Sequence, residues 1–158
     1  MTTSNEDILI LDTTKGVVKI ELRPDLAPGH VEHIKKLVRE GFYDGLSFHR
    51  VIDGFMAQGG CPKGTGTGGS KYPDLKAEFN SAPHVRGTCS MARAQNPNSA
   101  NSQFFIMFAP GDFLNGQYTV VGKVVSGMEH VDKIKLGDDA NNGSVTDPDR
   151  MIKVTVGK

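Results

Sequence analysis

The chain has 158 residues, and 18 Lys plus Arg balance 18 Asp plus Glu, so the formal net charge is zero. This length favours a single domain, expected over residues 1–158, and a neutral chain lacks the long-range attraction that nucleic acid or an anionic membrane requires. With 19 glycines and only 7% aromatic residues, the composition favours many turns and short strands over a long helical bundle. We expect neither nucleic acid nor a membrane as partner, and a monomer, because no long heptad pattern is present.

The start of the chain and its cysteines bear on location. Residues 1–7 carry no basic segment, and the apolar run from Ile8 to Leu11 is far shorter than a signal-peptide core or a membrane span. Cys61 and Cys89 form no C-x-x-C pair, which indicates free thiols in a reducing compartment. We therefore expect a cytoplasmic protein.

The first third of the chain predicts a hairpin and a helix. Residues 8–12 and 17–22 alternate between apolar and polar side chains around a short turn, which is typical of a β-hairpin with one buried face. Pro28 suits the first turn of a helix, and Gly41 can end that helix in a left-handed cap. The apolar stripe of this helix comprises Val31, Ile34, Leu37 and Val38.

A second helix is expected to begin at Ser126, whose spacing to Glu129 is that of a capping box, and to stop at Gly137. Strand-like runs lie between the two helices, at residues 47–52, 55–58, 88–92, 103–108 and 118–125, and a last strand alternates through Ile152, Val154 and Val156. This order argues for an antiparallel barrel or sandwich with two packed helices, and against a parallel sheet. The irregular stretches at residues 59–85 and 95–102 are long enough to suggest a functional role.

Two patterns point weakly to other chemistry. Residues 64–69, G-T-G-T-G-G, fit the glycine spacing of a dinucleotide-binding turn, but Pro73 stands where the helix should open, so a simple glycine-rich turn is preferred. His30 and His33 have the spacing of two metal ligands, but no third ligand has a matching spacing. We expect solvated histidines on the polar face of the first helix, and no metal.

The densest unusual segment is residues 48–60, F-H-R-V-I-D-G-F-M-A-Q-G-G, in which D-G predicts a hairpin turn. A regular two-residue turn would pair Arg50 with Ala57 and send Gln58 to the face opposite Arg50. If Arg50 and Gln58 share one site, the strand that starts at Phe55 must be twisted or bulged.

Two further segments complete the pattern: S-M-A-R at residues 90–93 with S-Q-F-F-I at 102–106, and F-L-N-G-Q-Y at 113–118. Together with residues 48–60 and the glycine-rich turn, they stand in the order and rough spacing of the cyclophilins, which the chain resembles over nearly its whole length. The cyclophilins are cyclosporin-binding peptidyl-prolyl cis-trans isomerases, and this chain is similar to their compact bacterial cytosolic members. The resemblance implies a mostly β fold, an eight-stranded antiparallel closed β-barrel capped by two α-helices.

The resemblance also implies a set of site residues. Arg50 matches the catalytic arginine of the family, and Ala92 and Arg93 match the strand that holds the peptide backbone. The proline-pocket positions are matched by Phe55, Met56, Gln58, Gln103, Phe105 and Leu114. We expect Gln58 to orient Arg50 and Gln103 to bond the substrate backbone.

Three positions depart from the best-known eukaryotic pattern: Phe113 replaces a tryptophan, Tyr118 a histidine and Arg93 an asparagine. Phenylalanine lacks the indole N–H donor, which implies weak cyclosporin binding, whereas the apolar wall for a proline ring survives the exchange. Phe113 and Tyr118 are therefore kept among the substrate-binding residues. Cys61 follows the glycine pair, where an acidic residue is usual.

These residue types suit a reaction that needs no cofactor. Rotation about a peptide bond has a barrier of roughly 18 to 20 kcal/mol. In the twisted state the prolyl nitrogen regains its lone pair, so a guanidinium beside this nitrogen would stabilise only that state. We expect proline-containing peptides and unfolded proteins as substrates, so that the protein assists folding. The alternative is a proline-peptide binding module or chaperone with the same pocket and little turnover, and a nucleotide-binding protein is a more distant one.

Overall fold

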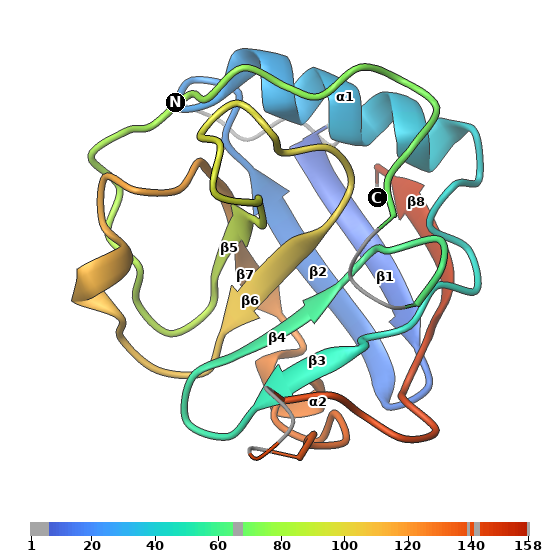
Figure 1. Ribbon diagram of the computed structural model, residues 1–158. Helices are drawn as coiled ribbons and strands as arrows, with labels where there is room; N and C mark the ends of the chain where they lie inside the picture. Colours follow the sequence, from blue (N-terminus) through green and yellow to red (C-terminus); the bar gives the residue numbers. More distant parts are fainter. Residues whose placement is uncertain (1–6, 65–67, 139, 141–142, 158) are drawn as a thin grey trace.

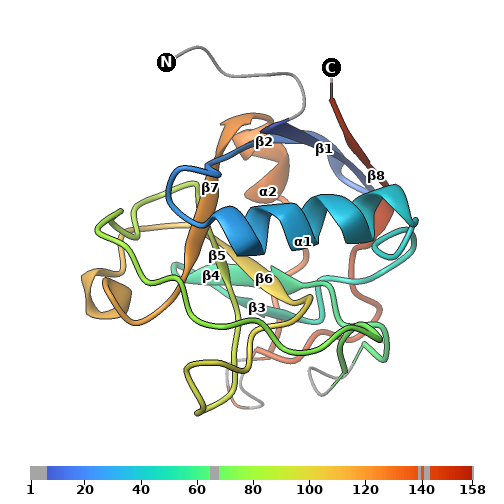
Figure 2. The same ribbon diagram turned by 90° about the horizontal axis from the view of Figure 1, so that it is seen from above.

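The computed structural model describes residues 7–64, 68–138, 140 and 143–157. Within these residues, eight antiparallel strands form one sheet in the order β3-β4-β6-β5-β7-β2-β1-β8. The strands are β1 (Ile8–Thr13), β2 (Gly16–Leu22), β3 (Arg50–Ile52), β4 (Met56–Gly59), β5 (Thr88–Met91), β6 (Phe104–Met107), β7 (Val120–Ser126) and β8 (Met151–Val156). The sheet curls around its core, with helix α1 (Pro28–Arg39) across one end and the short helix α2 (Met128–Val131) at the other (Figures 1 and 2). The predicted class, mostly β with eight antiparallel strands and two helices, is confirmed.

The barrel is open rather than closed. Regular pairing ends at β3 on one edge and at β8 on the other, and among the described residues an isolated bridge between Ser47 and Arg150 crosses the gap. Backbone hydrogen bonds from Gly45 to Met151 and from Met151 to Leu46, at 2.7 and 2.8 Å, tie the chain before β3 to the start of β8. The predicted closed barrel is therefore wrong, because β3 is only three residues long and the described residues form no continuous ladder across the gap.

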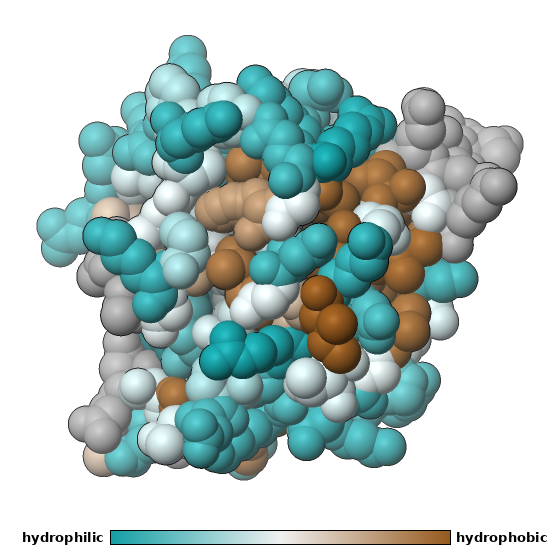
Figure 3. Space-filling model, turned by 90° about the vertical axis from the view of Figure 1, so that its right-hand side faces the viewer, coloured by the Kyte–Doolittle hydropathy of each residue, from teal (hydrophilic) through white to brown (hydrophobic). Residues whose placement is uncertain are grey.

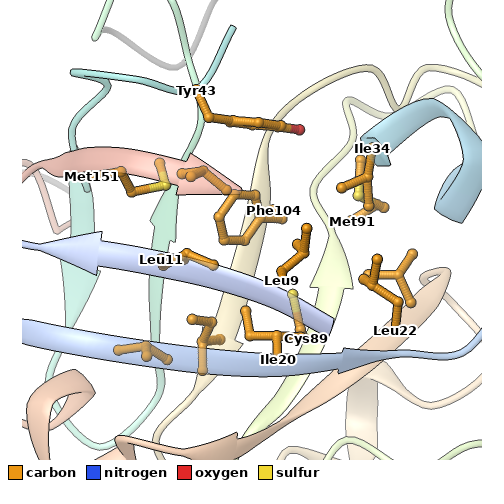
Figure 4. Packing of buried hydrophobic residues seen from close by; sticks show 14 of the residues in the cluster. Leu9, Leu11, Ile20, Leu22, Ile34, Tyr43, Cys89, Met91, Phe104 and Met151 are labelled. Carbon is orange, nitrogen blue, oxygen red and sulfur yellow. The ribbon is translucent and has the colours of Figure 1, made fainter. Parts of the chain in front are cut away.

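Alternate side chains of the strands fill the inside of the barrel. Figure 4 shows them meeting side chains from α1 and from the segment that follows it. They include Leu9 and Leu11 of β1, Ile20 and Leu22 of β2, Cys89 and Met91 of β5, Phe104 of β6 and Met151 of β8, with Ile34 and Tyr43, each at most 5% exposed. The predicted opening hairpin is confirmed, with Thr13 paired to Gly16 across its turn.

The two ends predicted for α1 are confirmed. Pro28 is its first residue, and Gly41 has a φ of 75° just after its end. The N–H of Gly41 donates to the carbonyl of Val38 and that of Phe42 to the carbonyl of Leu37, both at 3.0 Å. This pair of bonds is a Schellman motif, for which glycine is the preferred residue.

The N-terminus of α1 is capped from a distant part of the chain. Ala27, the N-cap residue, makes no side-chain cap hydrogen bond. The carboxylate of Glu78 instead accepts hydrogen bonds from the N–H groups of Gly29 and His30, at 3.1 and 2.7 Å. A negative charge at this end also interacts favourably with the positive end of the helix dipole. The loop that carries Glu78 is thereby fixed against the helix.

His30 and His33 are buried, and the prediction of solvated histidines is wrong. Their exposed fractions are 1% and 9%. The Nε2–H of His30 donates to the carbonyl of Lys76 at 2.8 Å, and the ring of His33 meets that of Tyr72 edge-on at 5.8 Å. The segment around residues 72–78 covers this face of α1, which helical periodicity could not reveal. Among the described residues, no group of three His, Cys, Asp or Glu side chains is placed to hold a metal ion.

α2 is shorter than the helix that the sequence predicts. Ser126 is the last residue of β7, where it pairs with Lys19, and no side-chain cap hydrogen bond is formed at the helix start. Gly127, with a φ of 86°, turns the chain into the helix. The helix ends at Val131, well before the predicted stop, and turns then carry Ile134 into the core. Both predicted ends are wrong, and the start is displaced because the strand ladder extends through the presumed capping residue.

The edge strand β8 is protected by side chains beside it. The backbone N–H of Val154 donates to Oδ1 of Asp44 at 2.9 Å, which satisfies one donor of the edge. A hollow between β8 and the end of α1 is lined by Val38, Arg39, Gly41, Asp44, Lys153, Val154, Thr155 and Val156. Figure 3 shows the corresponding mixture of apolar and hydrophilic side chains on this face. Charged residues along an edge oppose its pairing with another sheet.

Cys61 and Cys89 are buried, and neither is part of a disulfide. Burial raises the pKa of Cys89 to about 12, so this thiol stays protonated at neutral pH. No helix in the described part of the chain combines the length and the apolar character that crossing a membrane requires.

The buried histidines should make stability depend on pH. Burial is the main cause that lowers the pKa of His30, His33, His49 and His84 below the ordinary 6.5. Below about pH 6.5 the unfolded chain therefore binds more protons than the folded chain. We expect the free energy of unfolding, measured by urea titration, to fall as the pH drops from 7 to 5.

His30 allows a specific test of this dependence. Its protonation would place an N–H on Nδ1, a buried atom for which the described residues offer no hydrogen-bond partner. The carboxylate of Glu78, 4.0 Å from Nε2, offsets part of this cost. His30→Gln keeps an amide donor for the Lys76 carbonyl and removes the titration, so the slope of stability against pH should flatten. An unchanged slope in this variant would contradict the assignment.

Candidate active site

The hairpin of β3 and β4 places Arg50 directly opposite Gln58. The turn between the two strands contains three residues, one more than the two-residue turn that D-G predicts. The N–H of Phe55 donates to the carbonyl of Ile52 at 3.0 Å, and Gly54 adopts a φ of 72°. Phe55 is therefore the additional residue, which follows a tight turn with glycine at its left-handed position.

The additional turn residue decides which face each side chain occupies. Arg50, Met56 and Gln58 lie on the outer face of the barrel, whereas Val51 and Ala57 belong to the inner core. The strand after the turn pairs regularly, so the predicted bulge within it is wrong and the irregularity lies in the turn. A slip of one residue would move every side chain of β4 to the other face.

The outer face of β4 and β6 carries a second, smaller apolar cluster. Its buried members are Met56, Phe105, Met107 and Leu114. A cavity of about 110 Å³ lies beside it, lined by Arg50, Phe55, Met56, Gln58, Ala92, Arg93, Phe105, Leu114 and Tyr118. We call it the small cavity. Its volume is well below the roughly 300 to 1,000 Å³ of sites for drug-sized ligands, and it suits a small apolar ring.

Two glutamines connect the guanidinium to the neighbouring loop. Nη1 of Arg50 donates to Oε1 of Gln58 at 3.1 Å, and Nε2 of Gln58 donates to Oε1 of Gln103 at 2.9 Å. Nε2 of Gln103 donates in turn to the carbonyl of Gly68 at 3.0 Å. Each amide has one orientation, because its oxygen accepts and its nitrogen donates along this chain of hydrogen bonds. The chain holds Arg50 in one position at the wall of the small cavity.

Arg50 is half-buried beside apolar side chains. Burial lowers the pKa of its guanidinium below the ordinary value for arginine, and the electrostatic effect of Tyr118 acts in the opposite direction. An arginine keeps its charge at neutral pH under such conditions. In surroundings of low polarity, the charge acts more strongly on a nearby group than it would in water.

A buried histidine supports the floor of the small cavity. The ring of His84 stacks on that of Phe105, with centroids 6.1 Å apart and an interplanar angle of 18°. Its Nε2 lies 3.0 Å from Oγ of Ser90, and its backbone N–H donates to Oδ1 of Asn115 at 2.7 Å. The ring of Tyr118 meets the rings of both Phe105 and His84 edge-on. The sequence carries no signal for His84, because it stands alone in an irregular stretch.

A second cavity adjoins the first and shares Gln58, Ala92 and Arg93 with it. Its volume is about 690 Å³, and its other walls come from the loops around residues 68–74 and 94–103. We call it the large cavity. These loops belong to the two irregular stretches for which the sequence suggests a functional role.

All of the predicted site residues except Gln103 and Phe113 line the small cavity. Gln103 lies in the large cavity and reaches the small one through Gln58. Phe113 lines neither cavity: it is 72% exposed, with its ring 5.7 Å from that of Phe55. Residues 65–67 of the glycine-rich turn lie outside the described residues.

Comparison with known families decides the assignment. The sequence profile of the family described as cyclophilin type peptidyl-prolyl cis-trans isomerase/CLD matches residues 8–156. The chain belongs to the cyclophilin family. A probable peptidyl-prolyl cis-trans isomerase of Brucella suis biovar 1 is 64% identical over 162 residues, which cover 96% of this cyclophilin and 83% of the relative. Peptidyl-prolyl cis-trans isomerase B of Bacillus subtilis is 51% identical over 123 residues, covering 77% and 85% of the two chains.

Solved cyclophilins share the fold. Cyclophilin AquaCyp293 from Hirschia baltica matches with a TM-score of 0.87 and 29% identity, over 99% of this chain and 76% of its own. A cyclophilin type peptidyl-prolyl cis-trans isomerase of Cryptosporidium parvum, solved in the presence of the dipeptide Ala-Pro, matches with a TM-score of 0.87 and 30% identity, over 96% and 99% of the two chains. This cyclophilin is accordingly a peptidyl-prolyl cis-trans isomerase.

Breaking the chain of amides should weaken the activity of this cyclophilin. In Gln58→Leu, Arg50 loses an acceptor and Gln103 loses a donor. We expect kcat/KM on an X-Pro peptide to fall about tenfold, which corresponds to about 1.4 kcal/mol of lost hydrogen bonding. Glu32→Leu, at an exposed position in α1, is the control and should keep full activity. Equal activity of the two variants would contradict the role of Gln58.

Proposed function

We propose that Arg50 is the catalytic residue and that the small cavity holds the proline ring of the substrate. The observation that carries this proposal is the position of the guanidinium, which Gln58 holds at the wall of a small cavity next to the apolar side chains of Met56, Phe105 and Leu114. The apolar part would bind the ring by contact, while the charged part would face the bond to be rotated.

The chemistry follows from the electronic structure of the amide. The two isomers of an X-Pro bond differ by only about 0.5 to 1 kcal/mol, so the task is to lower a barrier of roughly 18 to 20 kcal/mol. The barrier arises because twisting the bond returns a lone pair to the prolyl nitrogen. An N–H of Arg50 would donate to that lone pair, an interaction that exists in the twisted state and not in the planar ground states.

Other residues would hold the substrate while the bond rotates. The backbone around Ala92 and Arg93, together with the amide of Gln103, would bind the peptide before the proline, so that rotation occurs against a fixed ring. A millionfold acceleration requires about 8 kcal/mol, whereas one hydrogen bond to a charged group contributes about 1.5 to 3 kcal/mol. Exclusion of water from the small cavity and orientation of the peptide would supply the remainder.

The proposed substrates are proline-containing segments of unfolded or flexible proteins, whose folding the enzyme would assist. The site needs a peptide that can reach the outer face of the barrel, which an unfolded chain provides. We propose a monomer that works in the cytoplasm, where the two free thiols would remain reduced. The proposed step uses protein side chains and requires no cofactor.

Exchange between the cis and trans isomers of an X-Pro peptide tests the role of Arg50. Arg50→Ala should lower kcat/KM by a factor that corresponds to about 2 to 4 kcal/mol, as removal of an oxyanion-hole donor does. Arg39→Ala, at an exposed position near the end of α1, is the matched control and should behave as the wild type. Wild-type activity of Arg50→Ala, with its fold intact by circular dichroism, would overturn the assignment.

The same experiment separates the isomerase from a proline-peptide binding module or chaperone. Titration of the peptide measures binding, and isomer exchange measures turnover. Exchange without catalyst takes tens to hundreds of seconds. Binding without acceleration of this exchange would support the binding module.

Phe113 should limit the affinity for cyclosporin. Its ring is exposed beside Phe55, so a larger indole can be accommodated there, and an indole adds an N–H donor. We expect Phe113→Trp to bind cyclosporin up to about tenfold more tightly, because one hydrogen bond contributes about 0.5 to 1.5 kcal/mol. Calorimetric titration measures the change, and Phe113→Leu is the control. Equal affinity of the tryptophan variant and the wild type would contradict this role.

A further inference from the structure

Arg93 carries a charge at the boundary between the two cavities. Its half-buried side chain lines both of them. None of the ion pairs among the described residues includes it. A cation in a substrate-sized hollow that has no carboxylate partner among the described residues is available to a carboxylate of the ligand.

The guanidinium is held in one position by backbone carbonyls and two aromatic rings. Nε and Nη2 donate to the carbonyl of Gln117 at 3.1 and 2.8 Å, and Nη1 donates to the carbonyls of Ala94 and Gln95 at 2.9 and 3.2 Å. The guanidinium carbon lies 4.8 Å from the ring centroid of Tyr118 and 5.7 Å from that of Phe79. The hydrogen bonds to the carbonyls use four of the five N–H groups of the arginine. The carbonyls orient the cation but carry no net charge, so within the described part of the chain no ion pair neutralises it.

The large cavity lies within reach of residues next to a bound proline. The two cavities share a wall, and one residue of extended chain spans about 3.3 to 3.6 Å. Among the described residues, the other charged side chain that lines the large cavity is that of Asp74, an exposed residue whose Oδ1 accepts a hydrogen bond from Asn101 at 3.1 Å. Asp74 does not line the small cavity. Of these two charges in the large cavity, that of Arg93 is therefore the one next to the small cavity, whose wall also includes Arg50.

We propose that Arg93 makes this isomerase selective for substrates with an aspartate or glutamate close to the proline. The acidic side chain would enter the large cavity and pair with the guanidinium at the boundary between the cavities. Asp74 would repel a carboxylate from its own part of the cavity, which restricts the acidic residue to positions near the proline. This selectivity rests on the proposed function, since it requires the proline ring to occupy the small cavity.

Matched peptides test the selectivity. Glutamate and glutamine have nearly the same shape, so a single Glu or Gln is placed in turn at each of the two positions before and the two positions after an Ala-Pro pair. At one or more positions, we expect kcat/KM for the Glu peptide to exceed that for the Gln peptide about fivefold at low ionic strength. A factor of about five is the upper end of what an exposed ion pair contributes. In about 1 M salt the ratio should approach one, because the screening length falls to about 3 Å.

Variants of Arg93 distinguish recognition of charge from support of the loops. Arg93→Gln removes the charge, so the ratio of kcat/KM for the Glu peptide to that for the Gln peptide should fall to one. The rates for all peptides can decrease in this variant, because the carbonyls of Gln117 and Ala94 lose their donor, but the ratio is independent of such a general decrease. Arg93→Lys keeps the charge and should retain a preference for Glu. Asp74→Asn is the control and should preserve or increase the ratio. A purely structural role would lower both rates and leave the ratio unchanged.

The outcomes separate this proposal from the function on which it rests. A kcat/KM ratio of one at every position in the wild type would overturn the selectivity, and so would a preference for Glu that persists in Arg93→Gln. In either case, acceleration of the Gln peptides would still support the isomerase site. Absence of acceleration for every peptide would overturn both proposals.

Discussion

The central strands of this barrel are buried on both faces, and the site depends on that constraint. One set of alternate side chains, which includes Ala57 and Ile106, fills the barrel, whereas the other, with Met56 and Phe105, forms the floor of the small cavity. Because side chains alternate with a period of two, the register that builds the core also determines which side chains reach the cavity. The pairing of Arg50 with its glutamine therefore follows from the same ladder that stabilises the fold.

Much of the fold could be predicted from local patterns. Alternating apolar and polar residues identified the first hairpin, and Pro28 and Gly41 identified the two ends of α1. These elements could be predicted because their ends depend on residues that are neighbours in the sequence. The errors arose where distant segments decide the outcome. His30 is buried by a loop far away in sequence, and Ser126 belongs to a ladder with β2 instead of capping a helix. Closure of the barrel likewise depends on how two distant edges meet, which no local pattern specifies.

The site was harder to derive from the residues alone. The spacing of D-G in a regular turn places Arg50 and Gln58 on opposite faces, and only one additional residue in the turn brings them together. Resemblance to a family supplied the set of residues, but not the chain of amides that fixes their orientation. Nor could the sequence reveal that His84 stacks behind Phe105, or that the guanidinium of Arg93 lies between two cavities, since both depend on contacts between segments that are distant in the sequence.

The loop from Gly68 to Glu78 is fastened at both of its ends. Its first carbonyl accepts a hydrogen bond from Gln103 in the site, and its last carboxylate holds two amides at the start of α1. A loop anchored in this way tolerates exchanges of side chains more readily than changes of length, because an insertion or deletion would release one of the anchors. Among homologous chains, differences in length should therefore accumulate outside this loop. The number of residues in the loop should stay the same wherever α1 is capped in this way.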